Sequence, residues 1–334
     1  MKALVVPAMG RLEIRDIAEP EPGPYDALVR IECCGICNST DTKLIDGTMY
    51  WAPPFPFVLG HESCGTVTRV GPKVRKFRVG DRVTRPVAFW SGSRPGLNIA
   101  SGGFAELGIV RDADAMAADG DNSLAEDYTA QRQLVVPSTL TPIEASLAIS
   151  LSETASMLRH LPNLRGKKVA VAGTGIAGLT FVLWCNLAGA TVISIGRRQP
   201  RLNEAVQLGA DMTLDTSHGD VAGNLSKLAG GKVDGIIEAT GDAKLANELL
   251  AALSRSGFAA AYGVPPTGVS YNKRWQSLPV EEHLSLHWVC NLLRRGWVKA
   301  DWFVSHSWSF SDIVSLFDEV REGRVRKGFV RIGT

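Results

Sequence analysis

The chain has 334 residues, of which 45% are hydrophobic and 21% are charged, and its formal net charge is +2. This length suggests two domains, and this composition is that of an ordinary globular protein. The balanced charge indicates neither a basic nucleic-acid surface nor an acidic tail, and no apolar run approaches the roughly 20 residues needed to span a bilayer. The opening segment 1–7 ends in a proline, too early for a signal peptide, so we expect a cytoplasmic protein.

The first 150 residues contain short apolar or alternating runs separated by glycine and proline. The clearest runs are 27–32, 64–70 and 81–84. Runs this short, bounded by turn residues, are typical of antiparallel strands, so we expect an irregular β-barrel. The acidic, alanine-rich stretch 112–132 is interpreted as a surface excursion from that barrel.

The pattern changes near residue 150, where strand-like runs begin to alternate with helical segments. This alternation indicates βαβ units and a parallel sheet. From about residue 300 short strands return with one helix at 311–322, which suggests that this segment rejoins the first domain. The expected strands are 168–172, 191–195, 211–214, 234–238 and 257–262, and the clearest helices between them are 178–187 and 200–208.

Three candidate metal ligands lie close together in the first domain. Cys37 precedes Gly60-His61-Glu62, which is followed by Gly65. A thiolate, an imidazole and a carboxylate suit one borderline ion, zinc. Two alternatives stay open: Cys34 and Cys37 could form a redox pair, and His61 could be a core histidine. The other cysteines are expected to be small buried apolar residues, because the six do not suggest a disulfide framework.

A glycine-rich turn follows the strand expected at 168–172. It reads Gly173, Thr174, Gly175, Ile176, Ala177 and Gly178 and leads into a helix. This is the dinucleotide-binding fingerprint, in which glycines let the backbone approach a pyrophosphate at a helix N-terminus. A metal together with a nicotinamide cofactor predicts hydride transfer to or from an alcohol or carbonyl group.

The end of the second strand of this domain predicts which cofactor binds. NAD-binding proteins have an acidic residue there, whereas this chain has Gly196 followed by Arg197 and Arg198. A small residue leaves room for the 2′-phosphate and guanidinium groups bind it, so we expect NADP(H). Arg201 is a weaker candidate, because it could point along the next helix. If the arginines are only solvated loop charges, the protein would use NAD or both cofactors.

The markers in this order resemble the zinc-containing medium-chain dehydrogenase/reductase family, which includes alcohol, polyol and threonine dehydrogenases. The resemblance is carried by Cys34-Gly-Ile-Cys37, Gly60-His61-Glu62-x-x-Gly65, Gly80-Asp-Arg-Val83, the fingerprint and the stretch 233–241. It implies an α/β protein: a GroES-like β-barrel catalytic domain at 1–150, a Rossmann doubly wound parallel sheet at 151–299, and a return to the catalytic domain at 300–334. The active site is then expected in the cleft between the domains.

The same resemblance implies roles for individual residues. Cys37 and His61 match the first two zinc ligands, and Glu62 matches a carboxylate that sits beside the metal or exchanges onto it. Glu153 occupies the place of the last ligand in the polyol-dehydrogenase branch. It could instead be a carboxylate favoured by a helix dipole.

Two departures from the family pattern have consequences. The stretch 86–103 contains no cysteine, so the four-cysteine structural zinc of many members is not expected and one catalytic zinc is predicted. Ser39 fills the place of the hydroxyl that accepts the alcohol proton. Thr42 stands where a histidine often passes that proton on, so the relay must use water, the cofactor ribose or a neighbour such as Lys43.

The substrate is the least predictable part. The ligand pattern of Cys, His, Glu and Glu favours a secondary alcohol or ketone of a polyol, sugar or cyclitol. One alternative is a biosynthetic NADPH-dependent aldehyde or ketone reductase, and a second is a non-catalytic nicotinamide-binding sensor. We expect a homodimer or homotetramer. Five aromatic residues either line the substrate pocket or only pack: Tyr50, Trp51, Phe57, Phe89 and Trp90.

Overall fold

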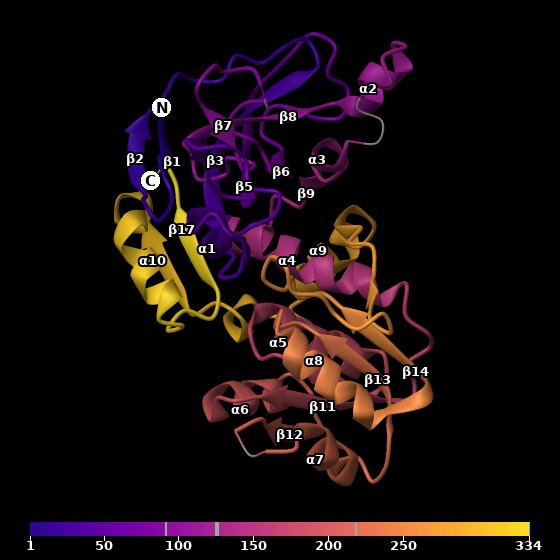
Figure 1. Cartoon of the computed structure of the whole chain (residues 1–334). Helices are drawn as coiled ribbons and strands as arrows, with labels where there is room; N and C mark the ends of the chain where they lie inside the picture. The colour runs from indigo at the N-terminus through magenta and orange to yellow at the C-terminus, as the bar shows by residue number, and fades with distance from the viewer. Residues whose placement is uncertain (91, 124–126, 218, 334) are drawn as a thin grey trace. The chain divides into compact units, whose positions relative to one another are not determined.

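The computed structural model describes residues 1–90, 92–123, 127–217 and 219–333. The chain forms two compact units, one of Met1–Ile149 with Leu286–Thr334 and the other of Ser150–Ser285 (Figure 1). The second unit therefore ends at 285, whereas the sequence suggested 299. The intervening helix α9 (Leu286–Arg294) belongs to the first unit. Its amphipathic pattern predicts a helix but does not tell which core it covers.

The first unit contains two sheets of mostly short strands, as expected for the barrel. One sheet has the order β2-β1-β4-β7, and the other has the order β16-β17-β3-β5-β6-β9, with β8 also paired to β3. The strands are β1 (Lys2–Val6), β2 (Glu13–Asp16), β3 (Asp26–Gly35), β4 (Phe57–Val58), β5 (Glu62–Val70), β6 (Arg82–Thr84), β7 (Asn98–Ile99), β8 (Leu107–Arg111), β9 (Val135–Val136), β16 (His306–Ser309) and β17 (Gly328–Arg331).

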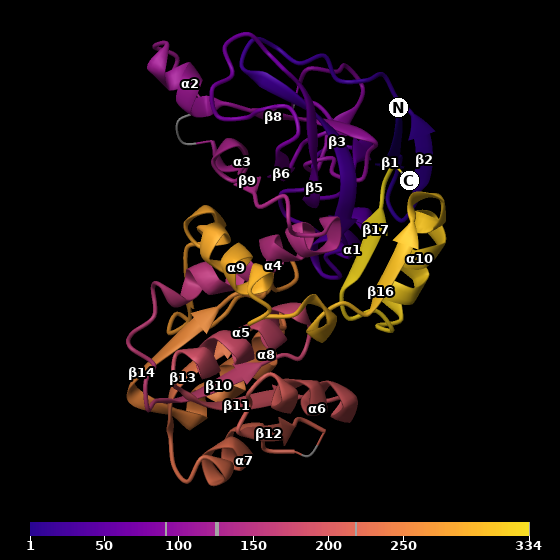
Figure 2. The same cartoon turned by 180° about the vertical axis from the view of Figure 1, so that it is seen from behind.

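The C-terminal segment completes this unit, as the sequence suggested. Strand β17 pairs antiparallel with β3, with Phe329 opposite Gly35, and both views show the yellow β17 beside the indigo strands (Figures 1 and 2). Helix α10 (Ile313–Arg321) buries Ile313 and Phe317 in the same core as Leu4. The first unit thus needs both ends of the chain.

The stretch 112–132 is more regular than the excursion expected from its composition. It forms α2 (Ala113–Ala118) and α3 (Tyr128–Gln131), while the part of the expectation that falls on 124–126 lies outside the described residues. Asp112 and Asp127 each cap a helix by accepting a backbone N–H bond three residues on. Asp112 also accepts the backbone N–H groups of Arg75 and Lys76, each at 2.7 Å, which anchors the stretch to the barrel unit.

The second unit is the expected Rossmann fold. Its sheet is entirely parallel with the order β12-β11-β10-β13-β14-β15, so the strand order reverses between β10 and β13. Ligands of such sheets bind beyond the carboxyl ends of the strands, at this reversal. The strands are β10 (Lys168–Ala172), β11 (Thr191–Gly196), β12 (Met212–Asp215), β13 (Val233–Glu238), β14 (Leu253–Ala261) and β15 (Gln276–Ser277), and the helices are α5 (Ile176–Leu187), α6 (Gln199–Gln207), α7 (Val221–Leu228) and α8 (Ala243–Leu249).

Helix α4 (Pro142–Leu158) is one of the two covalent links between the units, because the first part of the first unit ends at Ile149 and the second unit begins at Ser150. Its first half belongs to the barrel unit and its second half to the Rossmann unit. The other link lies between Ser285 and Leu286. None of the described helices has the length and apolar character required to cross a membrane.

Candidate metal and cofactor sites

The three candidate metal ligands of the barrel unit lie together. The donor atoms of Cys37, His61 and Glu62 are all within 4.8 Å of one another. Strand pairing explains this, because Gly35 at the end of β3 lies opposite Glu62 at the start of β5. The residues just beyond these strand ends therefore meet. Gly60 has φ of +102°, and a Cβ there would lie 2.6 Å from the backbone nitrogen of Phe104, so only glycine fits this turn.

Asp41 holds two of these ligands, a role that the sequence analysis did not assign. It is fully buried, and its Oδ2 accepts the backbone N–H of Cys37 at 2.9 Å. Its Oδ1 lies 3.2 Å from Nδ1 of His61, which leaves Nε2 as the ring nitrogen available to a metal. Burial lowers the pKa of His61, but the facing Asp41 carboxylate outweighs it and holds that pKa well above its ordinary value.

Glu62 is paired with a second residue that the sequence analysis missed. The ammonium group of Lys327 donates to Oε2 of Glu62 and, at 3.1 Å, to the carbonyl oxygen of Ile36. Lys327 is fully buried, which alone lowers its pKa, but the Glu62 carboxylate reverses the effect and raises that pKa above its ordinary value. A Cβ at Gly35 would lie 2.5 Å from Oε2 of Glu62, so glycine makes room for this ion pair.

The residues present fit a zinc ion. The cluster offers one thiolate, one imidazole and one carboxylate, the donor set that zinc accepts. The Asp41–His61 contact is the carboxylate–histidine arrangement that orients zinc ligands in proteins. The Lys327 ion pair engages one oxygen of Glu62 and leaves the other for a metal.

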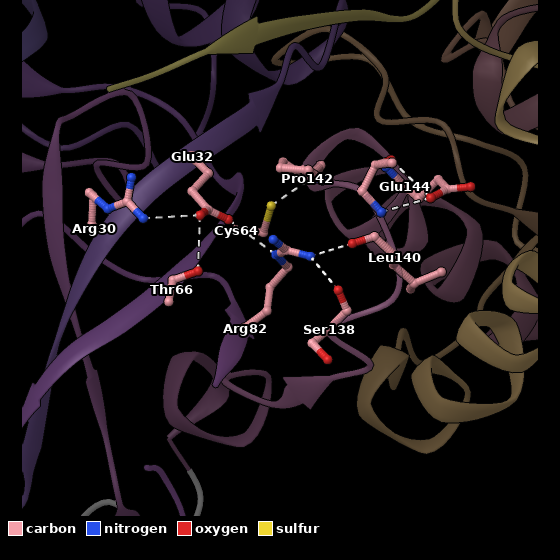
Figure 3. A network of polar contacts seen from close by, with 10 residues as sticks. Arg30, Glu32, Cys64, Thr66, Arg82, Ser138, Leu140, Pro142 and Glu144 are labelled. Carbon is pink, nitrogen blue, oxygen red and sulfur yellow. Dashed lines mark hydrogen bonds and ion pairs between the residues drawn. The ribbon is translucent and has the colours of Figure 1, made fainter. Parts of the chain in front are cut away.

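A polar network fixes the segment before α4 and the start of that helix (Figure 3). Arg82 of the Gly-Asp-Arg-Val motif donates to Glu32 at 3.1 Å and to the carbonyl oxygens of Ser138 and Leu140, just before the helix. Thr141 and Glu144 then form a reciprocal capping box, with bonds of 2.7 and 3.2 Å.

Ser146, one turn into α4, connects this helix to the metal cluster. Its hydroxyl donates to the backbone carbonyl of Glu62 at 2.5 Å. The motif arginine therefore acts through the segment before α4, which in turn supports the cluster.

Glu153 comes from the part of α4 that belongs to the Rossmann unit. Its Oε2 accepts the hydroxyl of Tyr262 at 3.0 Å, at the carboxyl end of β14. The cluster within the barrel unit thus consists of Cys37, His61 and Glu62, and Glu153 belongs to the other unit.

The candidate proton acceptor, Ser39, is the exposed N-cap residue of α1 (Thr40–Ile45), and its side chain makes no capping bond. Thr40 is half-buried at the first helical position. The hydroxyl of Thr42 donates back to the carbonyl oxygen of Asn38, just before the helix, at 2.7 Å. Ser39 therefore has a hydroxyl that no capping interaction occupies.

Glycine is required for a different structural reason at each of the three fingerprint positions of the Rossmann unit. Gly173 has φ of +113°, which the turn after β10 requires. Gly175 is the N-cap of α5, and a Cβ there would meet nothing within 4 Å, which leaves the helix N-terminus open to a phosphate. A Cβ at Gly178 would lie 1.9 Å from the carbonyl oxygen of Gly173, so helix and turn pack at a distance that only glycine permits.

The residues expected to determine the specificity for NADP over NAD lie at the end of β11 and just after it. A Cβ at Gly196 would lie 2.6 Å from Cγ2 of Thr174, so the fingerprint threonine occupies the space beside this glycine. Arg197 and Arg198 are exposed, while Arg201 pairs with Glu204 along α6 at 3.2 Å. Arg201 thus lies along the helix, which is the alternative that the sequence had left open for it.

The five aromatic residues suggested for the substrate pocket differ in exposure. Tyr50 and Trp51 are exposed by 77% and 46%, whereas Phe57 and Phe89 are in the core. The Trp90 indole donates to Asp26 at 3.3 Å and lies under the guanidinium of Arg111. Packing therefore accounts for Phe57, Phe89 and Trp90.

Comparison with known proteins assigns both units. Residues 23–119 match the family described as "Alcohol dehydrogenase GroES-like domain", and residues 177–286 match "Zinc-binding dehydrogenase". The resemblance of the barrel unit to GroES-like domains is thereby confirmed.

Relatives cover most of the chain. A "Probable alcohol dehydrogenase" of Mycobacterium tuberculosis is 31% identical over 76% of this chain and 73% of its own, and rat sorbitol dehydrogenase is 31% identical over 72% and 68%. A Sinorhizobium meliloti chain, described as a zinc-binding dehydrogenase bound to NADP, superposes with a TM-score of 0.81 and 27% identity over 99% of this chain and 98% of its own. The chain therefore belongs to the zinc-dependent medium-chain dehydrogenase family and is an alcohol-dehydrogenase-type oxidoreductase that uses zinc and a nicotinamide cofactor.

Proposed function

We propose that this protein transfers hydride between NADP(H) and a secondary alcohol or ketone of a polyol, sugar or cyclitol. The observation that carries the proposal is the cluster of Cys37, His61 and Glu62, whose donor atoms lie within 4.8 Å of one another. A metal held there acts as a Lewis acid that lowers the pKa of an alcohol and so favours hydride loss from its carbon.

The proposed ligands are Cys37 and His61, with Glu62 and Glu153 as the carboxylates that complete the set or exchange with substrate. Glu62 is suited to exchange with substrate, because the Lys327 ammonium group compensates the Glu62 carboxylate when Glu62 leaves the metal. One zinc per chain is proposed, because 86–103 contains no cysteine and this cluster is the only group of potential ligands among the described residues.

NADP(H) is proposed as the cofactor from the end of β11. Gly196 provides no acid to repel a 2′-phosphate, and the exposed guanidinium of Arg197 can bind one, together with Arg198. The NADP bound by the Sinorhizobium chain supports this choice.

A polyol-like substrate is proposed from the Cys, His, Glu and Glu ligand pattern. The likeness to rat sorbitol dehydrogenase supports it. Ser39 is proposed to accept the alcohol proton, and Tyr50 and Trp51 are the aromatic candidates with enough exposed surface to contact a substrate. Water, the cofactor ribose or Lys43 would then carry the proton onward.

A substrate screen of the zinc-loaded protein tests the proposal. Sugar alcohols, cyclitols, simple secondary alcohols and the corresponding carbonyl compounds are each incubated with NADP(H) and NAD(H), and nicotinamide absorbance is followed. We expect turnover of a polyol or cyclitol with NADP. Turnover of aldehydes alone would identify a reductase instead, and turnover with NAD alone would contradict the role of Gly196.

The role of Ser39 is tested with Ser39→Ala and the matched control Thr40→Ala, the next hydroxyl along the chain. A proton acceptor contributes roughly 10²- to 10⁴-fold, so kcat should fall by that factor in Ser39→Ala and much less in the control. A larger loss in Thr40→Ala would transfer the role to Thr40. Failure of the zinc-replete protein to retain zinc would favour the non-catalytic sensor.

A further inference from the structure

Glu238 is a buried carboxylate at the carboxyl end of β13, next to the point where the strand order of the Rossmann sheet reverses. Its exposed fraction is 0%, and no cation pairs with it in the described part of the chain. Burying an unpaired charge is costly unless hydrogen bonds compensate for it.

One oxygen of Glu238 organises the turn that follows its own strand. Oε1 accepts the backbone N–H of Thr240, the hydroxyl of Thr240 and, at 2.8 Å, the backbone N–H of Gly241. Gly241 has φ of +77°, and a Cβ there would lie 2.6 Å from the carbonyl oxygen of Val264. The carboxylate thus closes a tight turn against the loop after β14.

The other oxygen extends to the loop after β14. The hydroxyl of Tyr271 lies 2.5 Å from Oε2 of Glu238 and 2.8 Å from the carbonyl oxygen of Gly263. A Cβ at Gly263 would lie 2.5 Å from the same carboxylate oxygen. Burial and the Glu238 carboxylate both raise the pKa of Tyr271 above its ordinary value, so the phenol keeps its proton.

The turn fixed by Glu238 also touches the cofactor fingerprint. A Cβ built on Gly173 would lie 3.1 Å from Cγ2 of Thr240 and 3.2 Å from the backbone of Ala239. The exposed Thr240 therefore stands beside the first fingerprint glycine, at the edge of the sheet where dinucleotides bind.

We propose that Glu238 and Tyr271 are positioning residues that hold the turns after β13 and β14 in the geometry that accepts the nicotinamide half of the cofactor. In this fold the strands β10–β12 form one mononucleotide half, which takes the adenosine side, and β13–β15 form the other. Loss of the hydrogen bonds that Glu238 makes to the two turns lowers the fraction of molecules with correctly shaped turns. The apparent Kd of the cofactor then rises by the inverse of that fraction.

The test compares the whole cofactor with its adenosine fragment. Kd values for NADPH and for 2′,5′-ADP are measured by calorimetry on the zinc-loaded protein, together with kcat, KM and Tm. Glu238→Gln and Tyr271→Phe should each weaken NADPH binding by roughly tenfold or more, as expected for a lost hydrogen bond to a charged group, and leave 2′,5′-ADP binding unchanged. If NADH proves to be the cofactor, NADH and 5′-AMP replace the pair, so the test does not depend on the cofactor preference.

Asp234→Asn is the matched control. Asp234 lies on the same strand at its other end, where its carboxylate accepts the backbone N–H of Lys168 at 2.9 Å and ties β13 to β10. Its loss should lower Tm without changing either Kd. If Glu238→Gln does not fold, the binding measurements on Tyr271→Phe, which removes only one hydroxyl, decide whether the proposal holds. Unchanged NADPH binding in both variants, or an equal loss for NADPH and the fragment, would overturn the proposal.

Discussion

Asp41 contacts both Cys37 and His61, through different oxygens of one buried carboxylate. Oδ2 accepts the backbone N–H of Cys37 at 2.9 Å, and Oδ1 lies 3.2 Å from Nδ1 of His61. One side chain therefore contacts two proposed zinc ligands, one just after β3 and the other just before β5, before any metal binds.

Asp41→Asn should weaken zinc binding by about 10- to 100-fold, because it removes the carboxylate charge that faces the imidazole. Zinc affinity is measured by competition with a chelator over a range of pH in both proteins. In the zinc-free wild type the raised pKa of His61 favours the protonated imidazole, so zinc binding releases a proton and zinc affinity rises with pH until that pKa is passed. Asp41→Asn should flatten this pH dependence, and an unchanged profile would contradict the pairing.

Lys327→Met should destabilise the zinc-free protein by about 3–5 kcal/mol, because it leaves the Glu62 carboxylate buried without its cation. Urea denaturation measures the loss. The double variant Lys327→Met/Glu62→Gln should recover part of it, since the second substitution removes the uncompensated charge. A double variant that is as unstable as the sum of the single variants would show that the two groups do not interact.

Gly196→Asp alone should impair NADP use without producing good NAD use, because the new Cβ would lie 2.6 Å from Cγ2 of Thr174. The double variant Gly196→Asp/Thr174→Ala removes that clash. Its ratio of kcat/KM for NADP over NAD should fall by roughly 10- to 100-fold, as expected when charged contacts to a phosphate are lost. Equal ratios in the single and double variants would show that Thr174 does not restrict position 196.

Cys37 should be the one cysteine that iodoacetamide modifies in the zinc-free protein at neutral pH. It is half-buried, whereas the other five cysteines are buried and none of the six forms a disulfide, as expected. Burial raises the pKa of Cys33, Cys185 and Cys290 to about 12, so these thiols carry almost no thiolate. Peptide mass spectrometry should find one modified site, and zinc should protect it. A second fast-reacting site would contradict the structure.

The sequence predicted the elements and motifs that depend on local patterns. Five of the six described Rossmann strands differ from the expected ranges by at most four residues at either end, because alternating strands and helices leave a regular hydrophobic pattern. The sixth, the two-residue β15, was not predicted. The metal cluster of Cys37, His61 and Glu62 was predictable because its spacing reflects how two paired strands end.

Contacts between segments far apart in the chain leave no local pattern in the sequence from which they could be predicted. Lys327 and Glu62 are 265 residues apart, and Tyr271 reaches Glu238 from a loop without a motif. The contact of Asp41 with Cys37, by contrast, could have been predicted from the sequence, because Asp41 lies four residues after Cys37, the spacing of one helical turn. The helices α2 and α3 could also have been predicted, because Asp112 and Asp127 stand where capping residues belong.

The ion pair of Glu62 with Lys327 also fixes when the metal site is completed during synthesis. At roughly 5–20 residues per second, the 265 residues between them take about 13–53 seconds to translate. Throughout that interval the ribosome carries a chain in which Cys37, His61 and an uncompensated Glu62 are already made. The sheet that holds the three ligands also needs β17, which begins one residue after Lys327. The barrel sheet and the cation that Glu62 needs when buried are therefore completed together, at the end of synthesis.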